Sequence, residues 1–277
     1  MENIAYYNGR TGRIEDMMIP MNDRSTFFGD GVYDATGYSS GSLHCLDEHI
    51  ERFYRSANLV RIKIPVSREE LKKLLEDLCR QVDGDYLFVY WQTTRGTAPR
   101  AHEFPPAEVP ANLLVTVKPI PWPDFETRIK LTEMEDRRYE FCNIKTINLL
   151  PNVLAAQKAA EEGCEECVFH RGETVTECAH SNISILKNGT LITHPADCHI
   201  LPGIGRAHMI GACKALGIPV EERPYTLSEL RDADEALVSS SGKLCRLAAE
   251  FCHKPIGGKD TSTALRILDY MRKEINV

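Results

Sequence analysis

The segment NISILKNGTLIT, residues 182–193, places two short apolar runs on either side of Asn188-Gly189. Asn-Gly suits the type I′ turn of a two-residue hairpin, so Asn182–Leu186 and Leu191–Thr193 are predicted to pair as antiparallel strands. The next element along the chain is a helix, predicted over Arg206–Leu216. A hairpin followed by a helix departs from strict βαβ alternation.

The same mixture of strands and helices extends outward from this segment. Ser67-Arg-Glu-Glu70 is a capping box ahead of a leucine stripe, which predicts a helix. Another helix is predicted around Ile50–Ala57, with Asp47 as its cap. Apolar periodicity predicts further strands over Tyr86–Thr94, Asn112–Lys118, Arg128–Glu133, Cys167–Arg171 and Ala236–Ser239, and helices over Val153–Glu162 and Thr261–Ile275. The predicted fold class is therefore α/β with mixed sheets, of the α+β kind.

One proline-rich stretch suggests two domains. Pro119-Ile-Pro-Trp-Pro123 can continue neither a helix nor a central strand. We therefore expect an N-terminal α/β domain over residues 1–118, a linker over 119–124 and a C-terminal α/β domain over 125–277.

Composition limits the possible functions. The chain has 277 residues, 43% of them hydrophobic, and a net charge of −7. Those values exclude collagen, coiled coil and disordered classes, and the acidic balance argues against nucleic acid as a partner. The longest uncharged stretches, Ala35–Leu46 and Thr146–Gln157, are shorter than the roughly 20 residues of a membrane span. No secretory signal is visible at the N-terminus. We expect a soluble cytoplasmic protein with no membrane partner.

The ten cysteines could point to a metal or redox protein. Cys164 and Cys167 have C-x-x-C spacing, but no second pair follows at zinc-ribbon distance. Cys198, His199 and His194 lack regular ligand spacing. We therefore expect reduced, mostly buried thiols and no metal, and we keep a thiol-based metal or redox protein as the alternative of a different class.

Three features have both a functional and an ordinary interpretation. Gly203 and Gly205 precede the helix at Arg206, which fits an anion cradle or a plain strand–helix turn. Glu177 lies in an extended segment, where a buried carboxylate needs a positive or hydrogen-bonded partner; the alternative is a glutamate that faces water. Lys145 interrupts an apolar run, where it could be a desolvated nucleophile or a lysine whose head reaches solvent.

Arginine and histidine supply a further candidate. Arg100 and His102 stand at i and i+2 in the segment Thr94–His102, so in an extended loop both side chains could clamp a carboxylate. Arg52, off the apolar stripe of its helix, could equally be a solvated surface arginine.

The order of these motifs along the chain resembles the fold-type IV pyridoxal-phosphate aminotransferases, and within them the D-amino acid transaminases. The matching stretches are Phe28-Gly-Asp-Gly-Val-Tyr33, Asp47-Glu-His-Ile-Glu-Arg52, Thr94–His102, Ile144–Leu150, Thr174–Glu177 with Ser181-Asn182, Thr193-His-Pro195 and Leu201-Pro-Gly-Ile-Gly205. This resemblance implies the two-domain fold-type IV architecture and pyridoxal 5′-phosphate as cofactor. It also places the cofactor lysine in the C-terminal domain.

The resemblance implies a role for each candidate. Lys145 matches the catalytic lysine, which binds the cofactor as a Schiff base and moves the proton at the substrate Cα. Glu177 matches the carboxylate that holds the pyridine nitrogen protonated, so that the ring acts as an electron sink. The phosphate ligands implied are the Arg52 side chain, the amides of Ile204 and Gly205, and Ser241.

The implied substrates are a D-amino acid and a 2-oxo acid, in a ping-pong transamination. Tyr33, Arg100 and His102 match the trio that binds the α-carboxylate, and the family assembles this trio across a homodimer with shared active sites. A branched-chain L-amino acid aminotransferase and an aminodeoxychorismate lyase are the alternatives within the same fold.

The chain departs from the family pattern in three places. Cys178-Ala179-His180 replaces a serine-rich stretch, and Gly205 replaces the usual threonine. Lys243 and Arg246 are expected to add positive charge near the pocket, which leaves the preferred side chain open.

Overall fold

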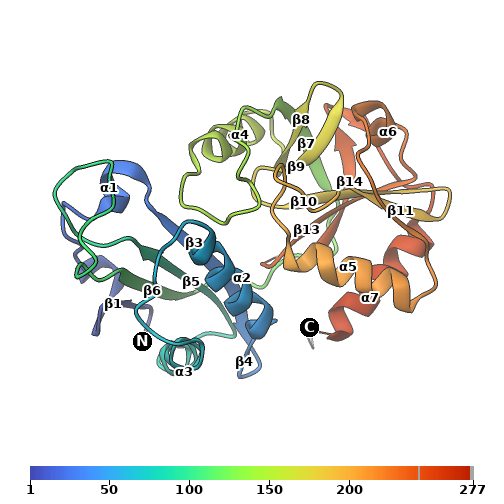
Figure 1. Ribbon diagram of the computed structural model, residues 1–277. Coiled ribbons are helices and arrows are strands. Elements are labelled where there is room, and N and C mark those ends of the chain that lie inside the picture. The colour runs from blue at the N-terminus through green and yellow to red at the C-terminus, as the bar shows by residue number, and fades with distance from the viewer. Residues whose placement is uncertain (243, 275–277) are drawn as a thin grey trace. The chain divides into compact units, whose positions relative to one another are not determined.

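The computed structural model describes residues 1–242 and 244–274. The chain forms two compact units, coloured from blue to red along the sequence in Figure 1. Unit 1 contains Met1–Trp122 and Ile144–Asn148, and unit 2 contains Pro123–Asn143 and the described residues from Leu149 onward. Each unit has its own sheet and its own hydrophobic core. The mixed α/β fold class expected from the sequence is confirmed.

Unit 1 is built on an antiparallel sheet with the strand order β2-β1-β6-β5-β3-β4. The long central pair, β3 and β5, runs in unbroken register from Gly31↔Thr94 to Ser39↔Tyr86. The strands are β1 (Ile4–Tyr7), β2 (Arg10–Gly12), β3 (Gly31–Ser39), β4 (Ser42–Leu43), β5 (Tyr86–Thr94) and β6 (Asn112–Pro119).

Helices α2 (Leu46–Leu59) and α3 (Arg68–Cys79) pack onto this sheet and share one core with it. The predicted capping box starts α3, since Ser67 Oγ accepts the Glu70 amide and Glu70 accepts the Ser67 amide. The predicted cap of α2 was wrong: Cys45 occupies the cap position, and Asp47 lies in the first turn, where its charge suits the helix dipole. The unit also contains a short 3-10 turn, η1 (Ile14–Asp16), and α1 (Arg24–Phe28).

Unit 2 contains a larger mixed sheet. Its order in the described residues is β12-β11-β10-β13-β14-β7-β8-β9, with β15 paired to β14. Parallel pairs join β7 to β8, β7 to β14 and β11 to β12, and the remaining pairs are antiparallel. The strands are β7 (Ile129–Glu135), β8 (Glu166–Arg171), β9 (Thr174–Cys178), β10 (Asn182–Lys187), β11 (Thr190–Thr193), β12 (Val220–Glu222), β13 (Glu235–Ser240), β14 (Leu244–Phe251) and β15 (Lys254–Pro255).

Strand β13 shows why this sheet is stable, because it is buried on both faces. Leu237 packs with α5 (Ile204–Ala215) and α7 (Thr261–Glu274), which lie side by side in Figure 1. Ala236 and Val238 point to the opposite face and join a second cluster with α6 (Leu227–Arg231). Helix α4 (Leu150–Glu161) packs on β8. None of the helices in the described part of the chain has the length and apolarity of a membrane span.

The segment Ile144–Asn148 belongs to unit 1, whereas the sequence placed Lys145 in the domain over 125–277. Strand β4 pairs only with the far end of β3, so the edge at residues 31–33 has room for another segment. Thr146 bridges to Val32, the Ile147 amide donates to the Gly31 carbonyl at 3.1 Å, and Ile144 packs on the core. Backbone pairing therefore holds the lysine segment on unit 1.

The predicted hairpin is confirmed. Strands β10 and β11 pair in antiparallel register, and the turn residues Asn188 and Gly189 have φ values of 51° and 73°. Positive φ at both central positions is the type I′ geometry. Two long strands, β3 and β14, were missed. Strand β3 has the sequence GVYDATGYS, in which an aspartate and an internal glycine obscure the strand pattern.

Gly96, at the start of the loop after β5, provides a test of the fold. It has φ +114°, and a Cβ there would lie 2.4 Å from the Pro110 carbonyl oxygen. We expect Gly96→Ala to lower the urea unfolding free energy by at least ~2 kcal/mol more than Gly41→Ala. Gly41 also has positive φ (+82°) but open space around it, so it isolates backbone strain. Equal losses in the two variants would show that the close approach to Pro110 contributes nothing.

Candidate active site

Lys145 is fixed through its backbone, while its amine stays free of polar partners. Its carbonyl accepts the Tyr33 amide at 3.0 Å, and its amide donates to Ser56 Oγ at 3.3 Å. The Nζ atom lies 4.3 Å from the centre of the Tyr33 ring. Within the described chain it makes no hydrogen bond or ion pair. A half-buried amine held against an aromatic ring and without a carboxylate partner is available to react.

Arg52 lies on the buried side of α2, which excludes the solvated surface arginine considered from the sequence. Only 4% of its surface is exposed, and its Nε and Nη2 atoms donate to the two oxygens of Asp34 at 2.9 and 2.7 Å. His49 Nδ1 lies 2.7 Å from Asp34 Oδ1. Burial raises the pKa of Asp34, but Arg52 and His49 outweigh burial and hold that pKa well below its usual range. Asp34 accepts hydrogen bonds from only two of the three guanidinium nitrogens. The third, Nη1, has no acceptor among the described residues.

The Arg100 to His102 segment is held by an arginine that the sequence did not single out. Arg24 Nη1 donates to the carbonyls of Ala101 (2.7 Å) and Glu103 (3.1 Å), and Arg24 Nε pairs with Asp30 at 2.7 Å. The Arg100 guanidinium and the His102 ring both lie against Phe28, at 5.2 Å from its centre.

Arg24 thus fixes the backbone of the segment, while the side chains of Arg100 and His102 stay exposed. Tyr33 stacks on Tyr90 at 5.4 Å and makes no hydrogen bond or ring contact with Arg100 or His102 among the described residues. One chain therefore does not assemble the expected carboxylate trio.

A cavity of about 310 Å³ in unit 1 lies beside this segment. Its wall includes Phe28 and His102, and also Thr146 and Asn148, which flank the lysine segment. The Arg100 to His102 segment and the lysine segment Ile144–Asn148 therefore border the same cavity in unit 1.

Glu177 in unit 2 is buried and has a positive partner, so the water-facing alternative is excluded. It is 5% exposed, and Arg138 Nη1 lies 2.5 Å from its Oε1 atom. Asn182 Nδ2 and the Leu201 amide both donate to Oε2 at 3.0 Å. Burial lowers the pKa of Arg138, but its hydrogen bond to Asp136 and the charge of Glu177 outweigh burial and raise it. The carboxylate is held by donors from three separate segments.

The start of α5 fits the anion-binding interpretation. The cap residue, Gly203, offers no side chain to the first amides of the helix, those of Ile204 and Gly205. A Cβ on Gly203 would lie 1.9 Å from Asn182 Oδ1, so only glycine allows this approach. Ser241 lies in the turn after β13, next to Ser240, whose backbone faces Gly205.

The residues that depart from the family pattern differ in their surroundings. Arg246 is 9% exposed and donates to the Thr127 carbonyl at 2.8 and 3.1 Å, so its charge serves the packing of unit 2. Lys243 lies outside the described residues. His180 Nδ1 lies 2.8 Å from Glu166, a buried carboxylate that also accepts Ser181 Oγ.

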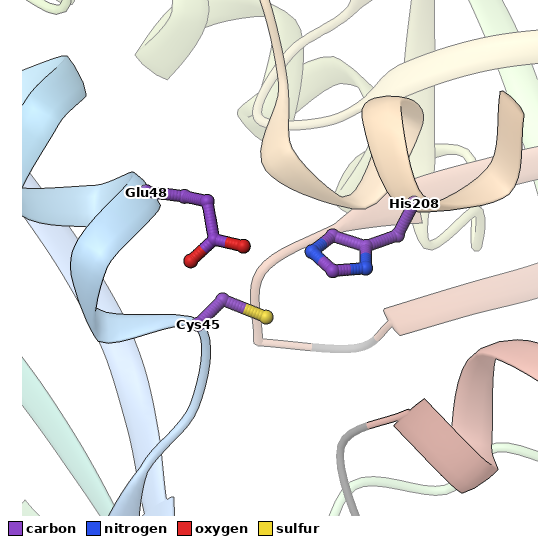
Figure 2. Close-up of side chains that lie close together, drawn as sticks. All are labelled: Cys45, Glu48 and His208. Atoms are coloured by element: carbon purple, nitrogen blue, oxygen red, sulfur yellow. The ribbon is translucent and has the colours of Figure 1, made fainter. Parts of the chain in front are cut away.

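The structure also contains cysteines and other possible metal ligands that are not among the candidate site residues described above. Figure 2 shows Cys45 and Glu48 at the start of α2 in unit 1, and His208 on α5 in unit 2, where His208 Nδ1 pairs with Glu274 at 2.9 Å. All ten cysteines are free thiols. Burial raises the pKa of Cys167 to about 12 and also raises that of Cys164, so neither is a thiolate at neutral pH.

Sequence reasoning missed Arg24, Asp34 and Arg138, which position the residues that it found. Each of the three contacts a residue far away in the chain, or lies in a segment without apolar periodicity. A single sequence does not reveal such contacts. None of the three lies in an element predicted from the sequence, so local patterns gave no signal for them.

Replacing Asp34 tests the buried network of unit 1. We expect Asp34→Asn to destabilise the cofactor-free protein by about 3–5 kcal/mol, because the Arg52 charge stays buried without its partner. The folded pKa of Asp34 is lowered, so the contribution is complete above the unfolded pKa of about 3.9 and is lost as the pH falls below it.

The measurement is urea denaturation between pH 3 and pH 7. Asp47→Asn is the control, since Asp47 is 81% exposed in its pair with Lys72 and should cost at most about 1 kcal/mol. A loss for Asp34→Asn no larger than this control, or an unchanged pH dependence, would contradict the role of the network.

Comparisons with known proteins identify the family of the chain. The model of the amino-transferase class IV family matches residues 31–251. The chain is 42% identical over 233 residues to a D-alanine aminotransferase of Listeria monocytogenes, covering 82% of this chain and 80% of that protein. It is 37% identical to a D-alanine aminotransferase of Staphylococcus haemolyticus, covering 86% and 85% of the two chains.

Solved structures show the same fold. A branched-chain aminotransferase of Thermoproteus uzoniensis matches with a TM-score of 0.88 at 23% identity, over 99% of this chain and 95% of that one. A transaminase of Curtobacterium pusillum matches with a TM-score of 0.83 at 20% identity, over 99% and 98%. The chain therefore belongs to the class IV aminotransferases, in agreement with the resemblance found in its motifs.

Proposed function

We propose that this aminotransferase uses pyridoxal 5′-phosphate to move the amino group of a D-amino acid, such as D-alanine or D-glutamate, to a 2-oxo acid in a ping-pong reaction. The observation that carries the substrate class is the 37–43% identity to D-alanine aminotransferases over more than four-fifths of the chain. The Arg100-Ala101-His102 segment supports it, and the cytoplasm is the expected location.

The phosphate end of the cofactor has candidate ligands in each unit. In unit 1, Arg52 has Nη1 free, while Asp34 fixes the plane of its guanidinium. In unit 2, the amides of Ile204 and Gly205 begin a 12-residue helix that has no side-chain cap. A dianion suits both groups, because the helix start and the guanidinium are electropositive. Ser241, in the turn beside Ser240, is proposed as a further ligand.

The ring end is proposed to face Glu177. The carboxylate forms an ion pair with Arg138, and its Oε2 atom is oriented by two further donors. Its negative charge would hold a proton on a ring nitrogen. When bound, the cofactor supplies an electron sink for cleavage of the substrate Cα–H bond and a carrier for the amino group.

Lys145 is proposed to hold the cofactor covalently and to move the proton at Cα. Its Nζ atom has no carboxylate partner within the described residues, and its backbone bonds to Tyr33 and Ser56 fix its origin. The Tyr33 ring at 4.3 Å limits where the amine can swing. A fixed lysine can take a proton only from the substrate enantiomer whose Cα–H faces it.

Substrate orientation is proposed to come from Tyr33 with Arg100 and His102 of a second copy of the chain. The exposure of Arg100 and His102 suits a clamp that acts on a neighbouring subunit. Helix α4 also carries an exposed apolar face, made of Leu150, Val153 and Leu154 with exposed fractions of 71%, 60% and 57%. Such a face suits a homodimer.

A stereochemical panel tests the proposed function. The purified enzyme with its cofactor is mixed with single D- and L-amino acids and no acceptor, and the cofactor absorbance is followed through one half-reaction. We expect D-alanine or D-glutamate to react fastest and Lys145→Ala to be inactive. L-leucine reacting faster than every D-amino acid would instead assign a branched-chain L-aminotransferase, and release of pyruvate from aminodeoxychorismate would assign the lyase.

Arg100→Ala tests the carboxylate clamp. Loss of the guanidinium leaves a desolvated carboxylate without its charged partner, so we expect KM for D-alanine to rise at least ~30-fold with unchanged cofactor content. The control is Arg55→Ala, which removes an exposed arginine of α2. An unchanged KM in Arg100→Ala would remove Arg100 from the substrate site.

Mixed subunits test whether the clamp acts between chains. We expect Lys145→Ala and Arg100→Ala chains, refolded together, to regain activity, because one of the two sites in each heterodimer has both residues. If the mixture is no more active than the sum of its parts, each chain supplies its own clamp.

A further inference from the structure

We propose that His194, Asp197 and His199, in the loop between β11 and α5, form a binding site for a divalent transition-metal ion of the zinc class. This inference goes beyond the proposed function, since transamination by this family is proposed here without a metal. The sequence alone did not predict the site, because the two histidines lack regular spacing and Asp197 was not recognised as the third ligand.

The distances fit a single ion. One ligand atom from each of the three side chains lies within 4.8 Å of the others. Asp197 Oδ2 lies 3.1 Å from His194 Nε2 and 3.8 Å from His199 Nδ1. Ligand atoms at roughly 2.0–2.1 Å from a tetrahedral Zn²⁺ are about 3.3–3.4 Å apart. Both carboxylate–imidazole distances are within about 0.5 Å of that spacing, and a bound ion would draw the two imidazoles, within 4.8 Å of each other, to the same spacing.

Asp197 is already oriented for this role. Its Oδ1 atom accepts the His199 amide at 2.8 Å, which turns Oδ2 toward the two imidazoles. A carboxylate that faces two imidazole nitrogens matches the mixed nitrogen and oxygen donor set preferred by zinc and its neighbours in the first transition row.

The two histidines differ in burial, and each is suited to bind a metal ion. His194 is 3% exposed, and its Nδ1 atom is buried without a hydrogen-bond partner among the described residues. With its proton on Nδ1 the ring presents a bare Nε2 to an ion, and coordination of Nε2 and Asp197 Oδ2 to that ion would replace the 3.1 Å hydrogen bond between them. His199 is 29% exposed, which leaves a path for the ion, and its Nε2 atom lies 3.7 Å from Glu140. A carboxylate behind a ligand histidine orients the ring.

The loop that contains this site also contacts Glu177, directly and through Arg138. The His199 carbonyl accepts Arg138 Nη2 at 3.2 Å, and Arg138 pairs with Glu177. Two residues further on, the Leu201 amide donates to Glu177 Oε2. A bound ion would fix residues 194–199 and thereby the segment that positions the carboxylate. We infer a structural role for the metal, with no part in bond making.

Metal titration of the tag-free enzyme with its cofactor tests this site. After dialysis against a chelator, Zn²⁺ is titrated in competition with a chromogenic chelator, and thermal unfolding is recorded with and without Zn²⁺. We expect one equivalent per chain and a higher Tm with zinc. His199→Gln and Asp197→Asn should each weaken that equivalent at least ~10-fold and abolish the Tm increase.

The control is His253→Asn, which removes an exposed histidine from the turn between β14 and β15 and suits its φ of 60°. This variant should bind zinc like the unaltered protein, which would show that the loss in the other two variants is specific to the proposed site. Absence of the equivalent, or its retention in either His199→Gln or Asp197→Asn, would overturn the proposal. D-amino acid specificity is measured separately, so failure of this site leaves the proposed function intact.

Discussion

The candidate site residues of unit 2 are arranged around one buried carboxylate, that of Glu177. A charge at this depth is costly unless donors surround it, and the chain brings three of them from separate segments. Arg138 follows β7, Asn182 begins β10, and Leu201 precedes α5. These bonds fix the ends of two strands and the entry to a helix at one place. Because Leu201 binds the carboxylate and shortly precedes α5, the uncapped start of the helix is tethered near Glu177.

Unit 1 uses the same principle around Asp34. This fully buried aspartate engages two of the guanidinium nitrogens of Arg52 and orients His49. The arrangement is costly to desolvate, and it leaves one guanidinium nitrogen for a ligand. Each unit thus prepares one charged group by surrounding it with fixed partners. Preorganisation of this kind lowers the cost of ordering side chains when a ligand binds.

Local signals in the sequence predicted much of the fold. The capping box of α3 and the Asn188-Gly189 hairpin are set by a few neighbouring residues, and both are present. Strand β3 was missed because Asp34, inside the strand, is buried and paired with Arg52, and pairing between distant residues is not visible in a local pattern. The unit to which Lys145 belongs is likewise decided by backbone pairing with β3, more than 100 residues earlier in the chain.

The candidate site shows the same division. Motif resemblance supplied Lys145, Arg52 and Glu177, whereas Asp34 and Arg138 emerged only from their contacts. The most direct test of the account is the rate of Cα–H cleavage in a single half-reaction of Glu177→Gln with D-alanine. We expect full cofactor content and a rate at least ~10²-fold lower, equivalent to about 2.7 kcal/mol. An unchanged rate at full cofactor content would contradict it, because the buried charge would then serve the fold alone.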